Sequence, residues 1–314
     1  MMRTTLFNKW VHLGLLVIVI GAFVTFFVGE RGTMHLRQGE IADFYISEGR
    51  AEKQALPFEV KLLLFDIEYH PDSDEPADYI SFLKFNDQVS RVSMNKIHKQ
   101  SGYRFYQMDY DRDEMGTVLM VSHDPWGIAI TYTGYLLLLI SLFWWLRKRM
   151  RWKHLLYAII LVAALWVYIS QLNPMTPVLR SPLLAAHVSV IMVAYLLFLA
   201  IAILGIIGIC SKKSRRGLDQ IALYLLRPAV TFLALGIIIG AVWANISWGR
   251  YWGWDPKETW ALITALVYAV PLHRNIKFLR NPQVFNCYCA LAFLAVLMTF
   301  FGVSYFLGGV HSYV

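Results

Sequence analysis

The chain is poor in charged residues and in cysteine. Charged residues make up 16% of its 314 residues, against roughly 25% in soluble domains, which argues against a soluble globular protein. The sequence has three cysteines, Cys210, Cys287 and Cys289, and none of them forms a C-x-x-C pair. This spacing argues against a disulfide framework and against a zinc site. If the protein takes part in thiol chemistry, we expect the thiols to come from a partner.

Apolar residues are abundant instead, at 57% of the chain, and the mean hydropathy is +0.48. A membrane-spanning helix needs about 20 mostly apolar residues. Seven runs approach that length, and the sixth is the shortest: Trp10–Val28, Trp126–Leu146, Leu155–Leu172, Leu183–Cys210, Ala229–Ile246, Lys257–Leu272 and Val284–Leu307. We therefore expect a polytopic α-helical membrane protein with about seven transmembrane helices.

The formal net charge of +8 comes from basic clusters between these runs. Three of the connecting loops, Arg147–Lys153, Lys212–Arg216 and Arg274–Arg280, carry them. Basic loops stay on the cytoplasmic side of a membrane. With seven spans, this pattern places the N-terminus inside and the C-terminus outside. The charge then reflects contact with membrane lipid, and we expect no nucleic-acid partner.

Residues 29–124 form the one polar stretch, which this topology places outside. It holds 18 acidic and 11 basic residues, a net charge of −7. Apolar and polar residues alternate in three segments: Phe58–Leu62, Tyr79–Phe85 and Gly116–Val121. Alternation between turn-rich stretches is typical of strands with one buried face. We expect one small external β-rich domain of five or six strands.

The predicted organisation has four parts. Residues 1–28 form the first transmembrane helix, and residues 29–124 form the external domain. Residues 125–150 form a linking transmembrane helix. Residues 151–314 form a membrane domain that contains a tryptophan-rich segment at 248–260.

Four histidines lie near the ends of predicted spans. His12 and His273 share the inner depth, whereas His187 and His311 share the outer depth. Ionisable groups at membrane depth are costly and usually have partners. A histidine near a helix end also lies simply at the headgroup level in many proteins, and this reading stays open for each of the four.

The tryptophan-rich segment lies on the outer side, with His187 and His311. It packs four tryptophans and one tyrosine into 13 residues, together with Arg250 and Lys257. One interpretation is an interfacial aromatic belt. The other is a haem site, with flat indole walls, cations for the propionates and imidazoles for the iron.

The motif Trp248-Gly249-x-x-Trp252-x-Trp254-Asp255 resembles the WWD signature of haem-handling cytochrome c assembly proteins, the CcsA/ResC and CcmC proteins. The ending Leu307–Tyr313 and the segment Pro177–Ser189 resemble CcsA segments that carry external histidines.

The N-terminal part resembles CcsB/ResB. His12-Leu13-Gly14, Ile20-Gly21-Ala22 and Gly29–His35 are similar to its last membrane helix and the start of its external domain, and Gly102–Gln107 is similar to the end of that domain. The chain therefore resembles the fused CcsB/CcsA (ResB/ResC) system II cytochrome c synthetases. The CcsB part looks N-terminally shortened, so we expect separate CcsB/ResB helices as partners.

The resemblance implies covalent attachment of haem b (iron protoporphyrin IX) to the Cys-x-x-Cys-His of an apocytochrome c outside a bacterial inner (cytoplasmic) membrane. It implies that His187 and His311 hold the iron at an outer site, and that His273 and His12 hold it at an inner one. Trp248, Trp252, Trp254, Asp255 and Arg250 would surround the outer haem. A thiol-reducing partner is expected. The alternatives are a CcmC-like haem carrier or exporter without ligation activity, and a scaffold without a ligand.

Overall fold

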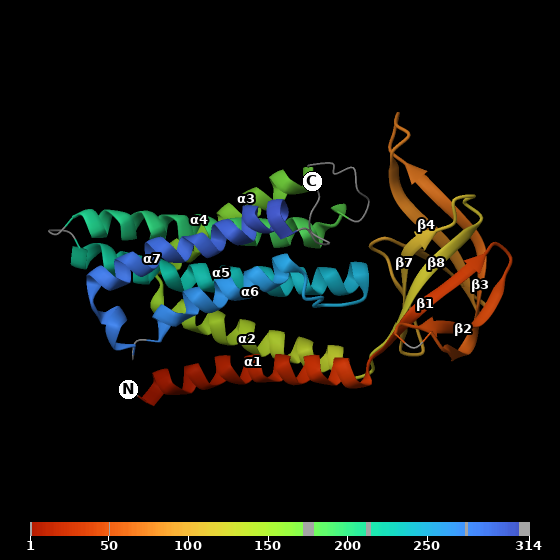
Figure 1. Ribbon diagram of the computed structural model, residues 1–314, viewed down its shortest axis with the longest axis horizontal. Helices are drawn as coiled ribbons and strands as arrows, with labels where there is room; N and C mark the ends of the chain where they lie inside the picture. Colours follow the sequence, from red (N-terminus) through yellow and green to blue (C-terminus); the bar gives the residue numbers. More distant parts are fainter. Residues whose placement is uncertain (1, 50, 172–178, 212–214, 274–275, 308–314) are drawn as a thin grey trace. The chain divides into compact units, whose positions relative to one another are not determined.

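The computed structural model describes residues 2–49, 51–171, 179–211, 215–273 and 276–307 (Figure 1). The chain divides into two compact units. The first unit comprises Met1–Ser141, Leu172–Pro182 and Val242–Tyr251, and the second comprises Leu142–Gln171, Leu183–Ala241 and Trp252–Val314. Each unit is described separately below.

The first unit contains an antiparallel sheet with eight strands among the described residues (Figure 1). The order across the sheet is β5-β4-β3-β2-β1-β8-β7-β6. The strands are β1 (Glu30–Arg37), β2 (Ile41–Ser47), β3 (Lys53–Tyr69), β4 (Pro76–Phe85), β5 (Gln88–Ser93), β6 (His98–Gln100), β7 (Tyr103–Tyr110) and β8 (Gly116–His123).

The alternating segments place one face of the sheet in an apolar core. Phe58, Phe85 and Phe105 come from three strands and pack edge to face, with ring centroids 4.9–6.2 Å apart. Ser81 of β4 donates a 2.6 Å hydrogen bond to the Gln107 side chain on β7, which is not its neighbour in the strand order. The sheet therefore curls over its own core.

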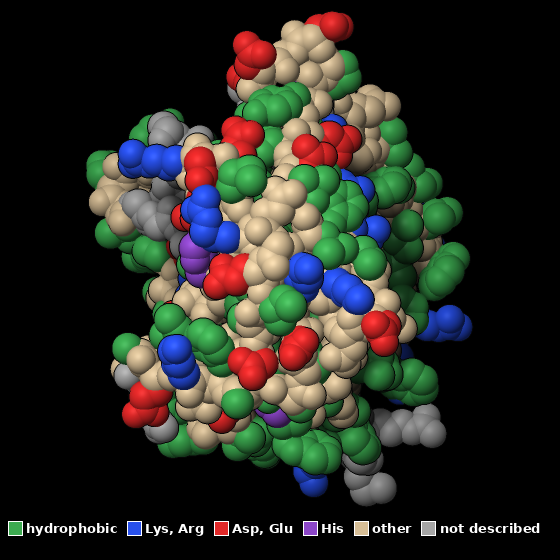
Figure 2. Space-filling view, turned by 90° about the vertical axis from the view of Figure 1, so that its right-hand side faces the viewer, with side chains coloured by type: hydrophobic (Ala, Val, Ile, Leu, Met, Phe, Trp, Pro, Cys, Tyr) green, Lys and Arg blue, Asp and Glu red, His purple; other side chains and the backbone are tan. Residues whose placement is uncertain are grey.

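The predicted β-rich domain is confirmed, but the expected five or six strands are too few. The three-residue strand β6 is too short for an alternating pattern to reveal it. The 17-residue strand β3 shifts register at Leu62/Leu64, which breaks its period of two. Acidic and basic side chains are mixed over the face of this domain that Figure 2 shows.

The helices are α1 (Met2–Val28), α2 (Gly127–Arg149), α3 (Trp152–Gln171), α4 (Pro182–Cys210), α5 (Arg215–Trp248), α6 (Pro256–Ala269) and α7 (Pro282–Leu297). The 3₁₀ turns η2 (Val270–Leu272) and η3 (Lys277–Arg280) follow α6, and the π-helix η4 (Met298–Leu307) continues α7.

Six helices in the described part of the chain are long and apolar enough to cross a membrane. Their surfaces expose large apolar side chains: Phe26 and Phe27 on α1 are 79% and 75% exposed. Such surfaces are stable when the surrounding solvent is lipid. Helix α6 has 14 residues and does not meet this length, so the count of seven spans stays a prediction.

Glycines let α1 and α2 pack closely in the first unit, where the two helices lie side by side (Figure 1). A Cβ at Gly14 would lie 2.9 Å from the backbone nitrogen of Leu138, and one at Gly21 would lie 2.6 Å from that of Thr131. Small residues at such crossings are the usual basis of helix packing in membranes.

Candidate functional site

The tryptophan-rich segment, Trp248–Trp260, turns from α5 into α6, and Asp255 caps the second helix. The Asp255 side chain accepts a 2.9 Å hydrogen bond from the backbone N–H of Lys257. The Glu258 side chain accepts from the N–H groups of Gly253 and Asp255, at 2.8 and 3.3 Å. This reciprocal pair is a capping box. The carboxylate of Asp255 therefore stabilises the backbone turn that follows Trp254 and begins α6.

Just before the cap, Trp254 projects outward. Its indole is 72% exposed, and it stands at 90° to the Trp252 ring with 5.9 Å between centroids. The backbone of Trp254 has a φ of +56°. A bulky side chain in the left-handed region is strained by roughly 1–3 kcal/mol, and such strain clusters at ligand sites. The second unit thus presents two perpendicular indoles ahead of α6.

A buried hydrogen-bond relay anchors Tyr251 in the first unit. The Tyr251 hydroxyl donates to Thr25 Oγ1 at 2.8 Å, and Thr25 donates to Asp124 Oδ2 at 2.6 Å. Asp124 also accepts from the N–H of Gly127 at 2.7 Å, and Thr131 donates to Tyr251 Oη at 3.3 Å. The relay joins the tryptophan-rich segment to α1 and to the β8–α2 junction.

The neighbouring residues pack on the sheet. A Cβ at Gly249 would lie 3.1 Å from both Met120 Sδ and Tyr106 Cε2, and the φ of Gly249 is +71°. Only glycine accepts that conformation and that approach without strain. Trp248 meets the buried Trp243 edge to face at 4.7 Å.

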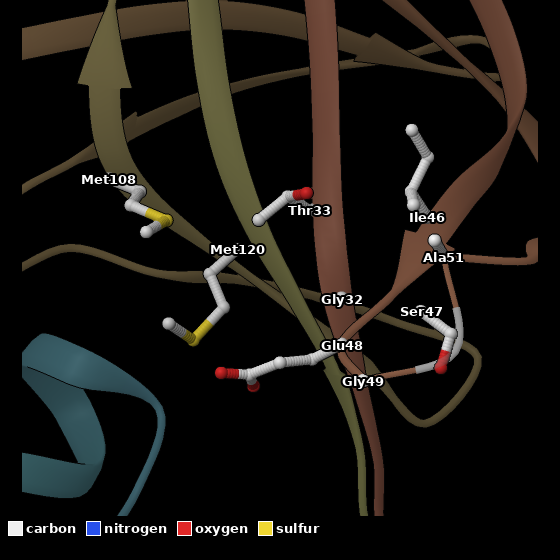
Figure 3. A pocket seen from close by; sticks show the side chains of 9 residues that line it. All are labelled: Gly32, Thr33, Ile46, Ser47, Glu48, Gly49, Ala51, Met108 and Met120. Carbon is white, nitrogen blue, oxygen red and sulfur yellow. The ribbon is translucent and has the colours of Figure 1, made fainter.

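A shallow pocket of about 430 Å³ opens on the same sheet (Figure 3). The Met108 and Met120 side chains turn toward it, with the Glu48 carboxylate near them (Figure 3). Methionine makes such surfaces adaptable to differently shaped ligands. The predicted site residues do not line this pocket, although Met120 also touches the position of Gly249.

In the second unit, His187 on α4 is held against α5. Its Nδ1 lies 2.7 Å from the carbonyl oxygen of Gly236. A carbonyl only accepts hydrogen bonds, so Nδ1 carries the proton and Nε2 carries the lone pair. A Cβ at Gly240 would lie 2.6 Å from Nδ1, so the glycine is needed for the ring to fit. Metal-binding histidines commonly have this second hydrogen bond to a carbonyl.

His273 follows the 3₁₀ turn after α6 and has the same arrangement. Its Nδ1 lies 3.0 Å from the carbonyl oxygen of Ala269, which again assigns the lone pair to Nε2. His12 is exposed on α1. These two histidines belong to different units, so their predicted pairing stays a prediction. His311 lies outside the described residues, and so does its predicted pairing with His187.

The second unit also ties the start of α6 to η4. Lys257 Nζ donates a 3.1 Å hydrogen bond to Ser304 Oγ, and Thr264 and Thr299 share one of 2.9 Å. The cation of Lys257, which the sequence offered to a carboxylate, is thus oriented toward η4.

The described residues fit haem as a substrate. His187 offers an imidazole whose Nδ1 is held by the Gly236 carbonyl, and Trp252 and Trp254 offer flat apolar walls. In the first unit, the indole N–H of Trp243 and Oδ1 of Asn245 are buried without a hydrogen-bond partner among the described residues. Buried polar atoms without partners are rare in proteins, and these two lie in the last turns of α5.

Comparison with known families agrees with this chemistry. The sequence model of the Cytochrome C assembly protein family matches residues 126–311, more than half of the chain. The chain belongs to that family. The model of the ResB-like family matches residues 4–122. This member of the cytochrome c assembly family therefore joins a ResB-like part to a CcsA-like part, and it is a multi-pass membrane protein.

Curated relatives share this assignment. NrfI of Wolinella succinogenes is 37% identical over 183 residues, which make up 51% of this chain and 20% of NrfI. The cytochrome c biogenesis protein CcsA of Chlamydomonas reinhardtii is 36% identical over 154 residues, 46% of this chain and 44% of that protein. CcsA of Guillardia theta is 36% identical over 170 residues, 45% of this chain and 56% of that protein. The aligned parts span less than two thirds of each relative.

Sequence reasoning missed the residues that hold the site in place. Tyr251, Thr25 and Asp124 form the relay, and Gly240 makes room for His187. A threonine within an apolar run and an aspartate just before one are weak signals of such a role. Their partners lie far away in the sequence, so no local pattern reveals them.

Proposed function

We propose that this protein acts in cytochrome c biogenesis by binding haem on the outer side of the membrane and promoting its covalent attachment to an apocytochrome c. The orientation of His187 is the observation that carries the proposal. Its Nδ1–H is used by Gly236, and its Nε2 lone pair is the form that binds iron. His187 lies in the part that matches the cytochrome c assembly family.

At the outer site, His187 and His311 would hold the iron. Trp248, Trp252 and Trp254 would contact the porphyrin, and Arg250 would meet a propionate. Asp255 contributes by fixing the turn through its cap. These residues position haem b, iron protoporphyrin IX, and exclude water from it.

At the inner site, His273 and His12 receive haem from the cytoplasmic side. The hydrogen bond from His273 Nδ1 to Ala269 supports this role, because it fixes the tautomer that ligates iron. Export then runs from the inner histidines to the outer ones.

The attachment reaction joins two thiols of the partner's Cys-x-x-Cys-His to the two vinyl groups of haem. Each S–H adds across one C=C bond, so that a C–S and a C–H bond form with no net oxidation. Haem supplies the vinyl groups, the apocytochrome supplies the thiols, and this chain supplies the geometry.

We place the protein in a bacterial inner membrane with the N-terminus inside and the C-terminus outside. In this arrangement the first helix comprises residues 1–28 and the external domain comprises residues 29–124. The linking helix comprises residues 125–150, and the haem-handling domain comprises residues 151–314. Separate CcsB/ResB helices and a thiol-reducing protein are the proposed further partners. A seventh span, formed by α6 and η2, completes this topology.

A CcmC-like carrier that binds haem without ligating it is the second candidate, supported by the same histidine and tryptophan-rich segment. The ResB-like match at residues 4–122 favours the synthetase, because a carrier needs no domain to receive a polypeptide.

The test is co-expression with an apocytochrome c in a host that lacks its own maturation system. We expect haem that stays on the cytochrome after denaturing electrophoresis, and His187→Ala should abolish it. Exogenous imidazole should partly restore haem binding to this variant. Haem bound by the protein without covalent product, even with CcsB helices supplied in trans, would favour the carrier.

A further inference from the structure

Two arginines flank β8 on the sheet face opposite the apolar core. Arg31 of β1 and Arg104 of β7 both pair with Ser122. Residues directly opposite each other in antiparallel strands point to the same side. The apolar core takes Val121 and Leu119 of β8, so the Ser122 row lies on the other face.

The start of the tryptophan-rich segment, Trp248–Tyr251, contacts this second face within the first unit. The adjacent row is Thr33, Met120 and Tyr106, and the position of Gly249 touches its last two members. Tyr106 and Ser122 are both 2% exposed. Arg250 follows Gly249 directly and precedes Tyr251, which is anchored to Thr25.

Arg250 therefore joins Arg31 and Arg104 in one arginine cluster. Burial lowers the pKa of Arg31, and the positive charge of Arg250 adds to this effect, while Glu48 opposes it. Burial raises the pKa of Tyr106, and the charges of Arg104 and Arg31 oppose that rise. The carboxylate of Glu48 is the acidic group that raises the pKa of Arg31, within a domain whose net charge is −7.

The cluster has more positive than negative charge in a half-buried place, which is costly unless an anion joins it. Ser122 is two residues before Asp124, and α2 begins at Gly127. The cluster thus lies close to the start of α2, beside Gly249 of the tryptophan-rich segment. A guanidinium binds carboxylates with two parallel hydrogen bonds.

We propose that Arg31 and Arg104 of the ResB-like domain, together with Arg250, form a carboxylate site within the first unit that binds a haem propionate. The inference rests on the proposed function and deepens it, because it names the residues that recognise the propionate. Each side of the fused chain then contributes cations to the same carboxylate.

The test compares haem with iron protoporphyrin IX dimethyl ester, which has no free propionates. Both are titrated into the purified full chain and followed by Soret absorbance. We expect the wild type to prefer haem over the ester by about tenfold, the effect of one charged hydrogen bond. Arg31→Gln and Arg104→Gln should bring this preference close to one while ester binding stays unchanged. Arg31→Lys should keep part of it.

Arg112→Gln is the matched control, since Arg112 is an exposed arginine of the same domain and its loss should leave the preference intact. An equal preference in wild type and Arg31→Gln overturns the inference. If the wild type binds neither haem nor the ester, the proposed function fails as well. The failure of the inference and the failure of the proposed function are therefore distinguishable. Binding of phosphatidylglycerol is measured in nanodiscs as well. If Arg31→Gln loses this binding but keeps the preference for haem over the ester, the cluster binds lipid phosphate, and the inference is overturned.

Discussion

At the residue scale, the tautomer of His187 links the fold to the proposed chemistry. The Gly236 carbonyl fixes the proton on Nδ1, and Gly240 leaves space for the ring. A histidine that only lay at the headgroup level would not need a glycine on the facing helix. The two glycines therefore support the proposed site, because one orients the ring and the other leaves space for it.

Gly240→Ala should lower the haem content of the protein nearly as much as His187→Ala. The new Cβ would lie 2.6 Å from Nδ1 of His187, so the ring must move and its Nε2 turns away from the iron. Haem per protein is measured by the visible spectrum after purification.

Gly217→Ala is the matched control, because it makes the same change on the same helix where no atom lies within 4 Å. Alanine favours a helix over glycine by about 1 kcal/mol, so neither variant should lose α5. If Gly240→Ala keeps the haem content of the wild type, haem binding does not depend on the orientation of His187.

At the element scale, the start of α6 depends on its cap. Asp255→Ala should cost about 1 kcal/mol of stability, as the loss of an N-cap does, and should weaken haem retention by loosening Trp254. Asp255→Ser keeps a capping oxygen without the charge, and it should retain most of both properties. The thermal unfolding midpoint and the haem content report the two effects separately.

If Asp255→Ser instead behaves like Asp255→Ala, the carboxylate charge itself serves the site, and the capping role is insufficient to explain the residue.

The relay from Tyr251 to Thr25 joins two elements distant in the sequence. Tyr251→Phe should destabilise the protein by about 1 kcal/mol, because it removes a buried hydrogen bond. In a double-mutant cycle with Thr25→Val, the two changes should couple by at least about 0.5 kcal/mol. Thermal unfolding in detergent measures each variant.

Tyr69→Phe is the control, since Tyr69 is 47% exposed and its loss should change little. Strictly additive effects of the Tyr251 and Thr25 variants would mean that the relay does not transmit stability between α1 and the tryptophan-rich segment.

At the scale of the whole molecule, the family boundaries and the compact units do not coincide. The ResB-like match ends at residue 122 and the cytochrome c assembly match begins at residue 126. Val242–Tyr251 nevertheless belongs to the compact unit of the sheet and α1. The part that carries the tryptophan-rich motif is thus divided between the units.

The topology is testable by labelling in intact cells. In a variant without Cys210, Cys287 and Cys289, a cysteine replacing Asp87 should react with a membrane-impermeant maleimide. A cysteine replacing Lys148 should react only after lysis, because basic loops stay inside. The Asp87 side chain is fully exposed, so its accessibility depends on the side of the membrane alone. If the cysteine that replaces Lys148 reacts in intact cells, the orientation is opposite to the proposed one.

The sequence alone determined the membrane class, the β-rich domain, the positions of the long apolar helices and the family. These properties depend on composition, on periods of two or on runs of about 20 residues, which are local features. The strand count failed at β6 and β3, where the pattern is too short or is broken by a register shift.

Only the tertiary structure decided which carbonyl orients His187 and which threonine anchors Tyr251. Only the strand register brought Arg31 and Arg104 to one face beside Arg250. The partners of His187 and Tyr251 lie 49 and 226 residues away in the sequence. Such contacts follow from how the helices and strands pack, and a side chain's own neighbours in the sequence do not specify them.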